Sequence, residues 1–585
     1  MRAILAHPWF HPLLLLLWTA LGLGLRFFNL AGKPLWTDEF ATIVFSLGNS
    51  FLTVPLDQVL TPEQLLQPLA PSPTAGIPQV VDRLLNESNH PPLYFILTHL
   101  WLKLFPPFQG MITVWQVRSI AALFGTLTIP ATFGFARFAF RSRLVAQLSA
   151  ALMAVSPFGI YLAQEARHYT LPLLLLIVSL GCLVSATRSI RVRTPLSFRI
   201  CLVWLVINAL GIATHYLFIL ALLVEALVLL TMGLIQSWRE QGQWYPSAHW
   251  WRIVAVAVGT TLAGLVWLPF LQEVQESKLT EWIQQSNRSG WDWINPLLQA
   301  IAGWISMLYL LPVQSESQPI AILSGVLLLG LTLWTIPKLI QGIQTQLKQS
   351  GARLPVLALG SYVTITILLF LGLTYGLGKN LTSAFRYNFV YFPAVIVLVG
   401  AALASLWRET LNQTQTEKPL NTRAWIKLLW TGNIRTVIMI GLLSLLGGLT
   451  VVTNLGYQKT HRPDLVAQDI REQSEAQVLI VIPHETHGQT GRLMGIAWEL
   501  QHNPAAAPLD PRYLLAHVET TPRSVIQVLR QTLNQYSRPL DLWLINMRDV
   551  PDAPLATLLK QQQCRAITKN KTVDGYRYRL YRCSN

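Results

Sequence analysis

Four short polar clusters interrupt a largely apolar sequence, and their residue types are those that bind anions or transfer protons. They are PLWTDEF at 34–40, NHPPLYF at 89–95, QEARHY at 164–169 and SAFRY at 383–387. Each cluster lies next to a long apolar segment. Ionisable groups are costly in such positions and are often functional. We therefore take these clusters as the candidate sites of chemistry.

The first two clusters could activate or orient a hydroxyl group. Asp38 or Glu39 could act as a general base, and His90 could bind a substrate oxygen or a phosphate. The alternative is structural: Thr37 or Asp38 could cap a helix that begins at Glu39, and Pro91 suits the first turn of a helix. Capping and catalysis can coexist at one residue, so both interpretations stay open.

The third cluster combines charge and aromatic rings at the end of an apolar helix. Arg167 could bind a phosphate through two parallel N–H bonds. Glu165 could hold that arginine or act on the substrate, and His168 and Tyr169 complete the cluster. The alternative is a structural pair of Glu165 and Arg167 that locks two helices together.

The fourth cluster places Arg386 and Tyr387 ahead of another apolar segment. Arg386 could clamp a phosphate at the bilayer surface. Alternatively, it could extend to the interface beside a tyrosine of the aromatic belt. A smaller turn, Thr214-His215-Tyr216, is interpreted as an interfacial anchor.

The elements that position these clusters are transmembrane helices. Of the 585 residues, 52% are apolar and only 12% are charged, about half the usual charged fraction. A soluble enzyme, a disordered chain and a coiled coil are excluded, because the apolar residues form runs long enough to cross a bilayer. Eleven spans are predicted, centred on 12–28, 115–136, 144–162, 171–187, 199–214, 217–235, 253–271, 319–337, 355–376, 388–406 and 436–454.

Basic residues orient these spans with the N-terminus in the cytoplasm. In this arrangement the inner segments hold 18 basic and three acidic residues, whereas the outer segments without the C-terminal region hold about 10 basic and twelve acidic ones, as the positive-inside rule requires. All four clusters then lie on the outer side. The net charge of +16 mainly orients the chain and does not indicate nucleic-acid binding.

Two outer regions are large. Residues 29–114 form a loop, and two apolar stretches, 91–105 in this loop and 296–313, are predicted as interfacial helices because both are short for a span. Residues 1–454 are thus a transmembrane domain. Residues 455–585 are predicted to form a small extracytoplasmic α/β domain, with strands near 478–482 and 542–545, a helix from 523 to 533 and a closing strand pair between 565 and 582.

The cysteines and the absent motifs narrow the chemistry further. Cys564 and Cys583 could pair if the C-terminal region faces an oxidising compartment. The sequence has no GxGxxG, Walker, HExxH or GxSxG motif and no metal-type Cys/His spacing, so cytoplasmic nucleotide chemistry is not expected. Carboxylates, arginines and aromatic rings at the outer boundary fit a substrate with an anionic head and a lipid tail.

The order of these motifs resembles glycosyltransferase family 39 of the GT-C superfamily, whose relatives include protein O-mannosyltransferases and lipid A aminoarabinose transferases. The likeness covers most of residues 10–400. It rests on the following segments: Leu35-Trp36-Thr37-Asp38-Glu39, His90-Pro91-Pro92-Leu93-Tyr94, Ser156-Pro157, Gln164-Glu165-Ala166-Arg167-His168-Tyr169 and Arg386-Tyr387. The sequence departs from the family at His168 and Asn388, where relatives often carry apolar or aromatic side chains.

The resemblance implies inverting transfer of a sugar from a polyprenyl-phosphate donor to a lipid, glycan or protein acceptor at the outer face of the cell membrane. Asp38, with Glu39 beside it, then maps onto the family's general base or acceptor-positioning carboxylate. Arg386 is the first candidate to stabilise the leaving phosphate and Arg167 the second. The family's second carboxylate region maps onto Glu165. A divalent metal is sometimes used in the superfamily, and Asp38 and Glu165 could hold one.

Two other classes of protein are weighed against this hypothesis. A transporter or flippase of lipid-linked saccharides would show inverted repeats and charges near the midplane, whereas here the polar clusters lie at one face and Glu225 is the only acidic residue inside a predicted span. A non-catalytic scaffold could use its outer domain to bind a glycan. Transfer of a sugar that depends on Asp38 distinguishes the enzyme from both.

Overall fold

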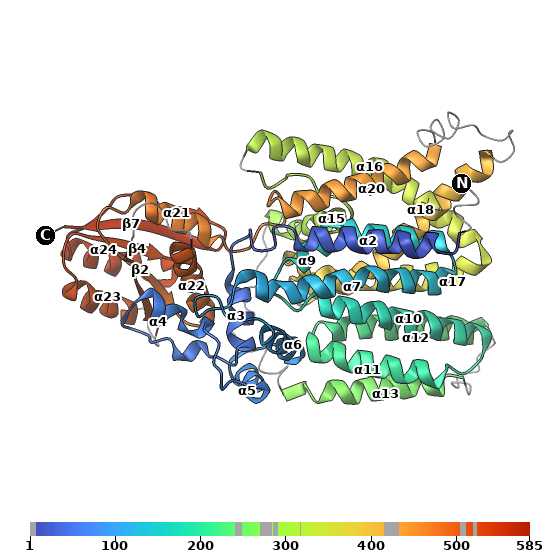
Figure 1. Cartoon of the computed structure of the whole chain (residues 1–585), viewed down its shortest axis with the longest axis horizontal. Helices are drawn as coiled ribbons and strands as arrows, with labels where there is room; N and C mark the ends of the chain where they lie inside the picture. Colours follow the sequence, from blue (N-terminus) through green and yellow to red (C-terminus); the bar gives the residue numbers. More distant parts are fainter. Residues whose placement is uncertain are drawn as a thin grey trace. The chain divides into compact units, whose positions relative to one another are not determined.

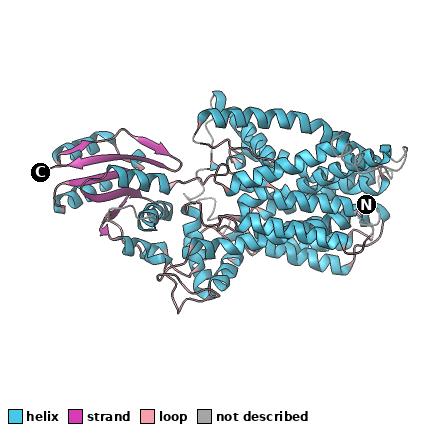
Figure 2. Cartoon of the chain, turned by 45° about the horizontal axis from the view of Figure 1, so that its top comes forward, coloured by secondary structure: helices cyan, strands magenta, loops and turns pink. Residues whose placement is uncertain are grey.

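The computed structural model describes residues 7–239, 249–269, 283–284, 290–315, 317–414, 432–502, 510–518 and 523–584. The chain divides into two compact units. The first consists of Met1–Leu30, Asn89–Tyr94 and Arg118–Tyr457, and the second of Ala31–Ser88, Phe95–Val117 and Gln458–Asn585. Figures 1 and 2 show that the first unit is built from helices and that the strands gather in the second.

The first unit is a bundle of long apolar helices, and every predicted span contains a helix or a bent helix pair. In the described part of the chain, eight helices are long and apolar enough to cross a bilayer. They are α2 (Phe10–Phe27), α7 (Val114–Phe140), α10 (Thr170–Val192), α12 (Phe218–Arg239), α16 (Gln318–Lys348), α17 (Ser350–Gly376), α18 (Phe392–Thr414) and α20 (Gly432–Val452).

The three other predicted spans are less regular. The pair α8 (Arg143–Val155) and α9 (Pro157–Ala163) bends by 55° at its break, and α11 (Phe198–Thr214) and α13 (Trp251–Leu265) are shorter apolar helices. The helices confirm a polytopic α-helical membrane protein, while the count of eleven spans stays a prediction. Short 3-10 turns complete this unit: η4 (Gly290–Trp293), η5 (Leu381–Ser383) and η6 (Phe385–Val390).

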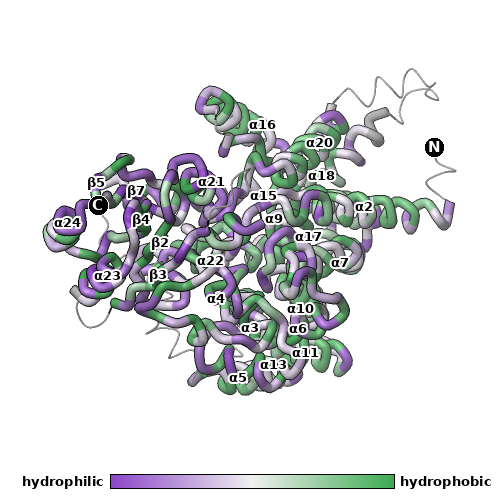
Figure 3. The backbone as a smooth tube through the Cα atoms, turned by 60° about the vertical axis from the view of Figure 1, so that its left-hand side comes forward, coloured by the Kyte–Doolittle hydropathy of each residue, from purple (hydrophilic) through white to green (hydrophobic). Residues whose placement is uncertain are grey.

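Apolar side chains on the surface of these helices are suited to lipid. Leu16 of α2 is 63% exposed, and Ile322 and Val326 of α16 are 67% and 64% exposed. The hydropathy colouring of Figure 3 shows the same apolar character along the helices of this unit. In water such an apolar surface would drive aggregation. In a bilayer it would contact the lipid tails, which are apolar as well.

The break between α8 and α9 arises from Ser156 and Pro157. Pro157 takes the first position of α9, where a missing N–H is harmless. The Ser156 hydroxyl accepts a hydrogen bond from the Gly159 amide and donates one to the Met307 carbonyl. Ser156 therefore caps α9 locally and also connects the break to the distant Met307.

Arg26 of α2 donates hydrogen bonds to carbonyl groups that lack helical partners because of this break. The Met153 carbonyl would normally accept from the amide of residue 157, but Pro157 has no N–H. The fully buried Arg26 guanidinium instead donates to the carbonyls of Met153 and Ala154 at 2.9 and 3.0 Å.

The two apolar stretches excluded from the span count also form helices. They are α6 (Leu93–Leu102) and α15 (Asn295–Leu308), with 10 and 14 residues. Neither reaches the roughly 20 residues that a span needs. Their location at the membrane interface stays a prediction.

The second unit joins the segment after α2 to the C-terminal region. Its N-terminal segment contains α3 (Thr37–Ser46), η1 (Phe51–Thr53), β1 (Val59–Leu60), α4 (Pro62–Leu66), η2 (Gln67–Leu69) and α5 (Ile77–Glu87). Strand β1 pairs antiparallel with β3 (Arg512–His517), and Leu60 lies opposite Tyr513. The strand at one edge of the sheet, β1, is therefore far in sequence from β3, the strand with which it pairs.

The C-terminal region forms the predicted small α/β fold. Its other elements are α21 (Pro463–Gln473), β2 (Gln477–His484), α22 (His487–His502), α23 (Arg523–Gln535), β4 (Leu540–Ile545), η7 (Met547–Asp549), α24 (Asp552–Gln561), β5 (Cys564–Ala566), β6 (Lys571–Val573) and β7 (Tyr576–Cys583). The strand order is β1-β3-β2-β4-β7-β5, with β6 paired to β7. Strand β2 runs parallel to both β3 and β4, and β7 runs antiparallel to β4.

Both faces of this sheet are covered. Leu479 and Val481 of β2 belong to an apolar cluster with Val525 and Leu529 of α23 and with residues of α24. The alternate residues of β2 are also buried, and α22 contacts the same strand. A continuous buried run of this kind is typical of a central parallel strand.

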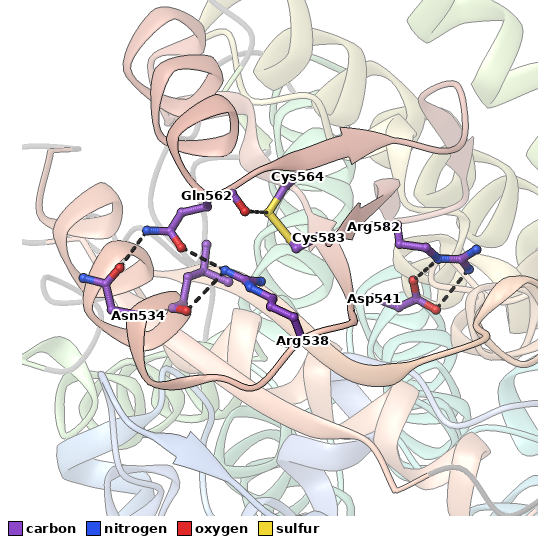
Figure 4. The surroundings of a disulfide bond; sticks show 8 residues. Asn534, Arg538, Asp541, Gln562, Cys564, Arg582 and Cys583 are labelled. Atoms are coloured by element: carbon purple, nitrogen blue, oxygen red, sulfur yellow. Dashed lines mark hydrogen bonds and ion pairs between the residues drawn. A yellow bond between two sulfur atoms is a disulfide. The ribbon is translucent and has the colours of Figure 1, made fainter. Parts of the chain in front are cut away.

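The C-terminal strand is fixed covalently and electrostatically. Cys564 of β5 and Cys583 of β7 are directly opposite each other and form a disulfide. Figure 4 shows this bond and, near it, the Arg582 guanidinium donating to the buried Asp541 carboxylate, with Nε 2.7 Å from Oδ1. The pairing of these two cysteines, which the sequence left open, is thus present.

Candidate active site

The third cluster forms the turn that links two helices of the first unit. Helix α9 ends at Ala163 and α10 begins at Thr170, so the residues between them leave the helical register. Glu165, Arg167 and His168 are nevertheless at most 2% exposed. Each of these polar groups loses its hydration when it is buried. Packing alone therefore does not explain why they lie in this turn.

The second and third clusters come together through one hydrogen bond. Arg167 Nη2 donates to His90 Nε2 at 2.9 Å. Since the guanidinium has no acceptor, the His90 ring accepts at Nε2 and carries its proton on Nδ1. The His90 and His168 ring centroids are 5.3 Å apart. Two motifs separated by about 75 residues therefore belong to one site.

Three histidines and a tyrosine pack around this bond. The His168 and His215 ring centroids are 4.4 Å apart, and Tyr169 lies 4.6 Å from His168. Neither ring nitrogen of the fully buried His168 has a hydrogen-bond partner among the described residues. A buried polar group without a partner indicates a place where a ligand or water binds.

The fourth cluster reaches the same site. Arg386 and Tyr387 lie in η6, are each 8% exposed, and the Arg386 guanidinium carbon is 5.6 Å from the Tyr387 ring centre. Tyr387 also packs edge-on against His215 at 6.4 Å. Burial by protein does not agree with the alternative that Arg386 extends to the membrane interface.

The electrostatics of the site favour an anion. Burial holds the pKa of His168 well below its usual value, and His215, Arg167, His90 and Arg386 lower it further. Burial likewise lowers the pKa of His215, with additional contributions from His90 and the two arginines. The histidines are therefore neutral, while two arginines carry positive charge into a low-dielectric site. A phosphate would satisfy both the charge and the ring N–H groups.

Asp38 and Glu39 lie in the second unit, in the first turn of α3. The helix begins at Thr37, and its N-cap residue is Trp36, which makes no side-chain capping bond. The Thr37 hydroxyl is instead 2.6 Å from His461 Nδ1. The prediction that Thr37 or Asp38 caps a helix starting at Glu39 is therefore wrong, because a distant histidine takes the hydroxyl.

The two adjacent carboxylates have different roles. Glu39 Oε2 lies 3.3 Å from Lys459 Nζ, and both side chains are at most 1% exposed. A fully buried ion pair of this kind locks α3 to the start of the C-terminal region. Asp38 is half-buried, so its carboxylate is the one that a substrate can reach.

Asp38 interacts electrostatically with two basic side chains of α22. Burial lowers the pKa of His487 to about 4 and the Asp38 carboxylate partly opposes this effect. Burial also lowers the pKa of Arg492, which Asp38 again counteracts. The His487 ring stacks on Phe51 with a centroid distance of 5.1 Å, so its position is fixed by packing.

The described residues contain no group of three or more His, Cys, Asp or Glu side chains that could hold a metal ion. Asp38 and Glu165, which the sequence suggested as metal ligands, belong to different units.

Several residues of these sites were missed from the sequence. His215 was interpreted as an anchor, although its position at the end of α11 is equivalent to that of the third cluster at the end of α9. Lys459, His487 and Arg492 follow the last span and carry no local motif. Only the tertiary fold places them beside α3.

No protein-family model and no curated protein matches this sequence. Among solved structures, ArnT from Cupriavidus metallidurans bound to undecaprenyl phosphate is similar, with a TM-score of 0.51, 15% identity and 97% of each chain covered. The same enzyme in the apo state gives a TM-score of 0.50 at 14% identity and the same coverage. The oligosaccharyltransferase AglB from Archaeoglobus fulgidus, in complex with an inhibitory peptide and a dolichol-phosphate, gives 0.46 at 11% identity over 97% of this chain and 74% of that one. The chain therefore shares the fold of ArnT along almost its whole length.

Proposed function

We propose that this protein is an integral-membrane glycosyltransferase that moves a sugar from a polyprenyl-phosphate donor to an acceptor, with inversion at the anomeric carbon. The single observation that carries the proposal is the cluster of the buried Arg167 and Arg386 with three histidines, of which His168 and His215 are neutral. It matches the chemistry of a lipid phosphate, and the fold is shared with an ArnT structure that holds undecaprenyl phosphate.

The donor phosphate is assigned to the first unit. Arg386 and Arg167 balance the charge that appears on the phosphate when its bond to the sugar breaks, and His90 holds the Arg167 guanidinium in place. His168 supplies a ring N–H to a phosphate oxygen. Such preorganised donors stabilise a leaving anion most strongly in a site without water.

Asp38 is assigned to the acceptor. In an inverting transfer, a hydroxyl or amine of the acceptor loses a proton to the carboxylate as its heteroatom bonds to the anomeric carbon. The bond from that carbon to the phosphate oxygen breaks, and polyprenyl phosphate leaves with the electron pair. Glu39 does not compete for this task, because its carboxylate is paired with Lys459.

The reaction is placed at the outer face of the cell membrane, with the N-terminus in the cytoplasm. Support comes from the basic residues of the predicted inner loops and from the disulfide between Cys564 and Cys583, since disulfides persist in oxidising compartments. Polyprenyl-linked sugars are the donors and the bilayer is the solvent of the lipid tail. The acceptor is a lipid, a glycan or a protein.

Transfer by the purified full-length chain tests this proposal. The protein is incubated with a panel of polyprenyl-phosphate sugars, and release of polyprenyl phosphate is measured for the unchanged protein and for Arg386→Gln. Removal of one preorganised donor lowers such rates by about 10²–10³, whereas Arg353→Gln, an exposed arginine of α17, leaves the rate unchanged. Equal rates for both variants would overturn the phosphate assignment.

The same panel separates the proposal from the two alternatives. A transporter moves the intact lipid-linked sugar between leaflets of a vesicle without releasing polyprenyl phosphate. A glycan-binding scaffold does neither. Either result would contradict the proposed activity.

A further inference from the structure

A crevice of about 350 Å³ opens in the second unit at the carboxyl ends of the parallel strands. Its floor is formed by residues that follow these strands: Glu485 after β2, Val518 after β3 and Asn546 after β4. The hairpin of β6 and β7 supplies a further wall. The volume is at the small end of the range for ligand pockets.

The topology of the sheet places this crevice where α/β sheets bind ligands. The chain leaves β2 through α22 to reach β3 on one side, and then passes through α23 to β4 on the other side of β2. The direction of winding therefore reverses at β2. Ligands of open α/β sheets occupy the crevice outside the carboxyl ends of the strands at such a switch point.

Three arginines line the crevice. They are Arg492 from α22, Arg548 from η7 and Arg577 from β7. Among the described residues, none of their guanidinium groups forms a hydrogen bond or an ion pair. Burial lowers the pKa of Arg492, and Arg548 lowers it further. The start of α22 is already capped, since the Gly488 amide donates to the Thr486 hydroxyl, so the guanidinium groups are the available donors.

Two carboxylates in the same crevice limit the kind of ligand. Glu485 and Asp549 also line it, so three positive and two negative groups surround the space. A small inorganic anion would meet repulsion from both carboxylates. A saccharide with one anionic group would use the arginines for that group and the carboxylates as acceptors for its hydroxyls.

Asn546 fixes the backbone conformation of one wall of the crevice. This residue has φ 54° and ψ 40°, in the left-handed region where asparagine is tolerated better than most residues. Its amide donates to the Arg577 carbonyl, its side-chain oxygen accepts from the Arg577 amide, and its side-chain nitrogen donates to the Gly575 carbonyl. Residues in sparsely populated conformations cluster at ligand sites.

We propose that this switch-point crevice binds a small saccharide that carries one carboxylate or phosphate group, held by Arg492 and Arg548. The site is separate from the donor phosphate cluster, and the inference does not rest on the proposed transferase activity. It adds a carbohydrate-binding site to the C-terminal region.

Binding of defined probes to the full-length purified protein tests the inference. Glucuronate and glucose 1-phosphate are titrated calorimetrically, with glucose and inorganic phosphate as comparison ligands. We expect at least one anionic sugar to bind with Kd below about 1 mM, and glucose and phosphate to bind at least about tenfold more weakly. Inorganic phosphate binding as tightly as both sugars, or no binding by either sugar, would overturn the proposal.

Variants locate the site. Arg548→Gln changes an exposed residue, and it should weaken sugar binding by about tenfold or more, equivalent to about 1.4 kcal/mol. Arg530→Gln, an exposed arginine of α23 outside the crevice, should leave binding unchanged. Hydrogen exchange should also slow at residues 546–549 and 572–577 when the sugar binds. Equal affinity for both variants, with no protection of these segments, would show that the sugar binds elsewhere.

Discussion

Two neighbouring carboxylates in α3 show how burial divides roles between residues of similar chemistry. Asp38 is half-buried and interacts electrostatically with His487 and Arg492, whereas Glu39 is fully buried against Lys459. A general base must be accessible to its substrate, and a buried ion pair must stay intact because an isolated buried charge is costly. The two residues should therefore respond differently to the same isosteric change.

Asp38→Asn should abolish most of the transfer without loss of protein. Proton transfer by a positioned carboxylate contributes about 10²–10⁴ in rate, and the amide preserves the shape of the side chain. The measurement is the initial rate of polyprenyl phosphate release at equal amounts of folded protein. An unchanged rate would remove Asp38 from the reaction.

Glu39→Gln should instead reduce the amount of folded protein. The substitution leaves the Lys459 ammonium buried without its counter-charge, which costs about 3–5 kcal/mol. Yield after detergent extraction and the melting temperature report this loss. The double variant Glu39→Gln with Lys459→Met removes both charges and should recover much of the stability, and failure of this rescue would contradict the ion-pair explanation.

The histidines of the second unit make its stability depend on pH. Burial lowers the pKa of His487 and of His484 to about 4, against about 6.5 in the unfolded chain. Between these values only the unfolded chain binds the protons. The free energy of unfolding therefore falls as the pH is lowered from 6.5, by about 1.4 kcal/mol per pH unit for each histidine.

His487→Phe should reduce this slope by the contribution of one histidine and keep the stacking on Phe51. Hydrogen exchange of β2 in the full-length protein, followed between pH 6.5 and about 4.5, measures the effect. His502→Phe, at an exposed position, serves as the matched control. Identical slopes in both variants would exclude His487 as the source.

At the scale of elements, the bend between α8 and α9 depends on a residue of another helix. Arg26→Met removes the donors for the Met153 and Ala154 carbonyls, and each unsatisfied buried carbonyl costs about 1–3 kcal/mol. The melting temperature should fall, whereas Arg137→Met, an exposed arginine at the end of α7, should have little effect. Adding Pro157→Ala restores the missing N–H and should recover part of the loss. No recovery would show that Arg26 stabilises the fold in another way.

The apolar elements were predictable because their signal is local. The length of each apolar run predicts a membrane helix, and the runs near 478–482 and 542–545 coincide with β2 and β4. The 523–533 periodicity coincides with α23. The two strands are continuous apolar runs in the sequence, and the helix repeats its apolar residues with a helical period.

Contacts between distant segments were not predictable in the same way. The Thr37 hydroxyl pairs with His461, more than 400 residues away, and nothing near Thr37 indicates this. His215 joins the histidine cluster only because α11 ends beside the α9–α10 turn. The polar clusters themselves were found from their position at helix ends, and their catalytic roles stay predictions.

At the scale of the whole molecule, the sidedness of the membrane protein can be measured directly. In a chain with Cys182 and Cys201 replaced by serine, Leu104→Cys and Gln501→Cys should react with an impermeant maleimide added to intact cells. Arg193→Cys should react only after permeabilisation. All three original side chains are exposed, so access to the reagent reports topology. The reverse pattern would invert the orientation and move the proposed reaction to the cytoplasm.

The pairing of β1 with β3 has a consequence for biosynthesis. Leu60 and Tyr513 are neighbours in the sheet, yet about 450 residues separate them along the chain. At about 5–20 residues per second, the ribosome needs roughly 20 to 90 s to deliver β3 after β1 has emerged. During this interval β1 lacks the strand with which it pairs, while the remaining helices are still being synthesised. The second unit is therefore completed only at the end of translation, and nascent chains arrested before β3 should be far more sensitive to protease in the loop than the finished protein.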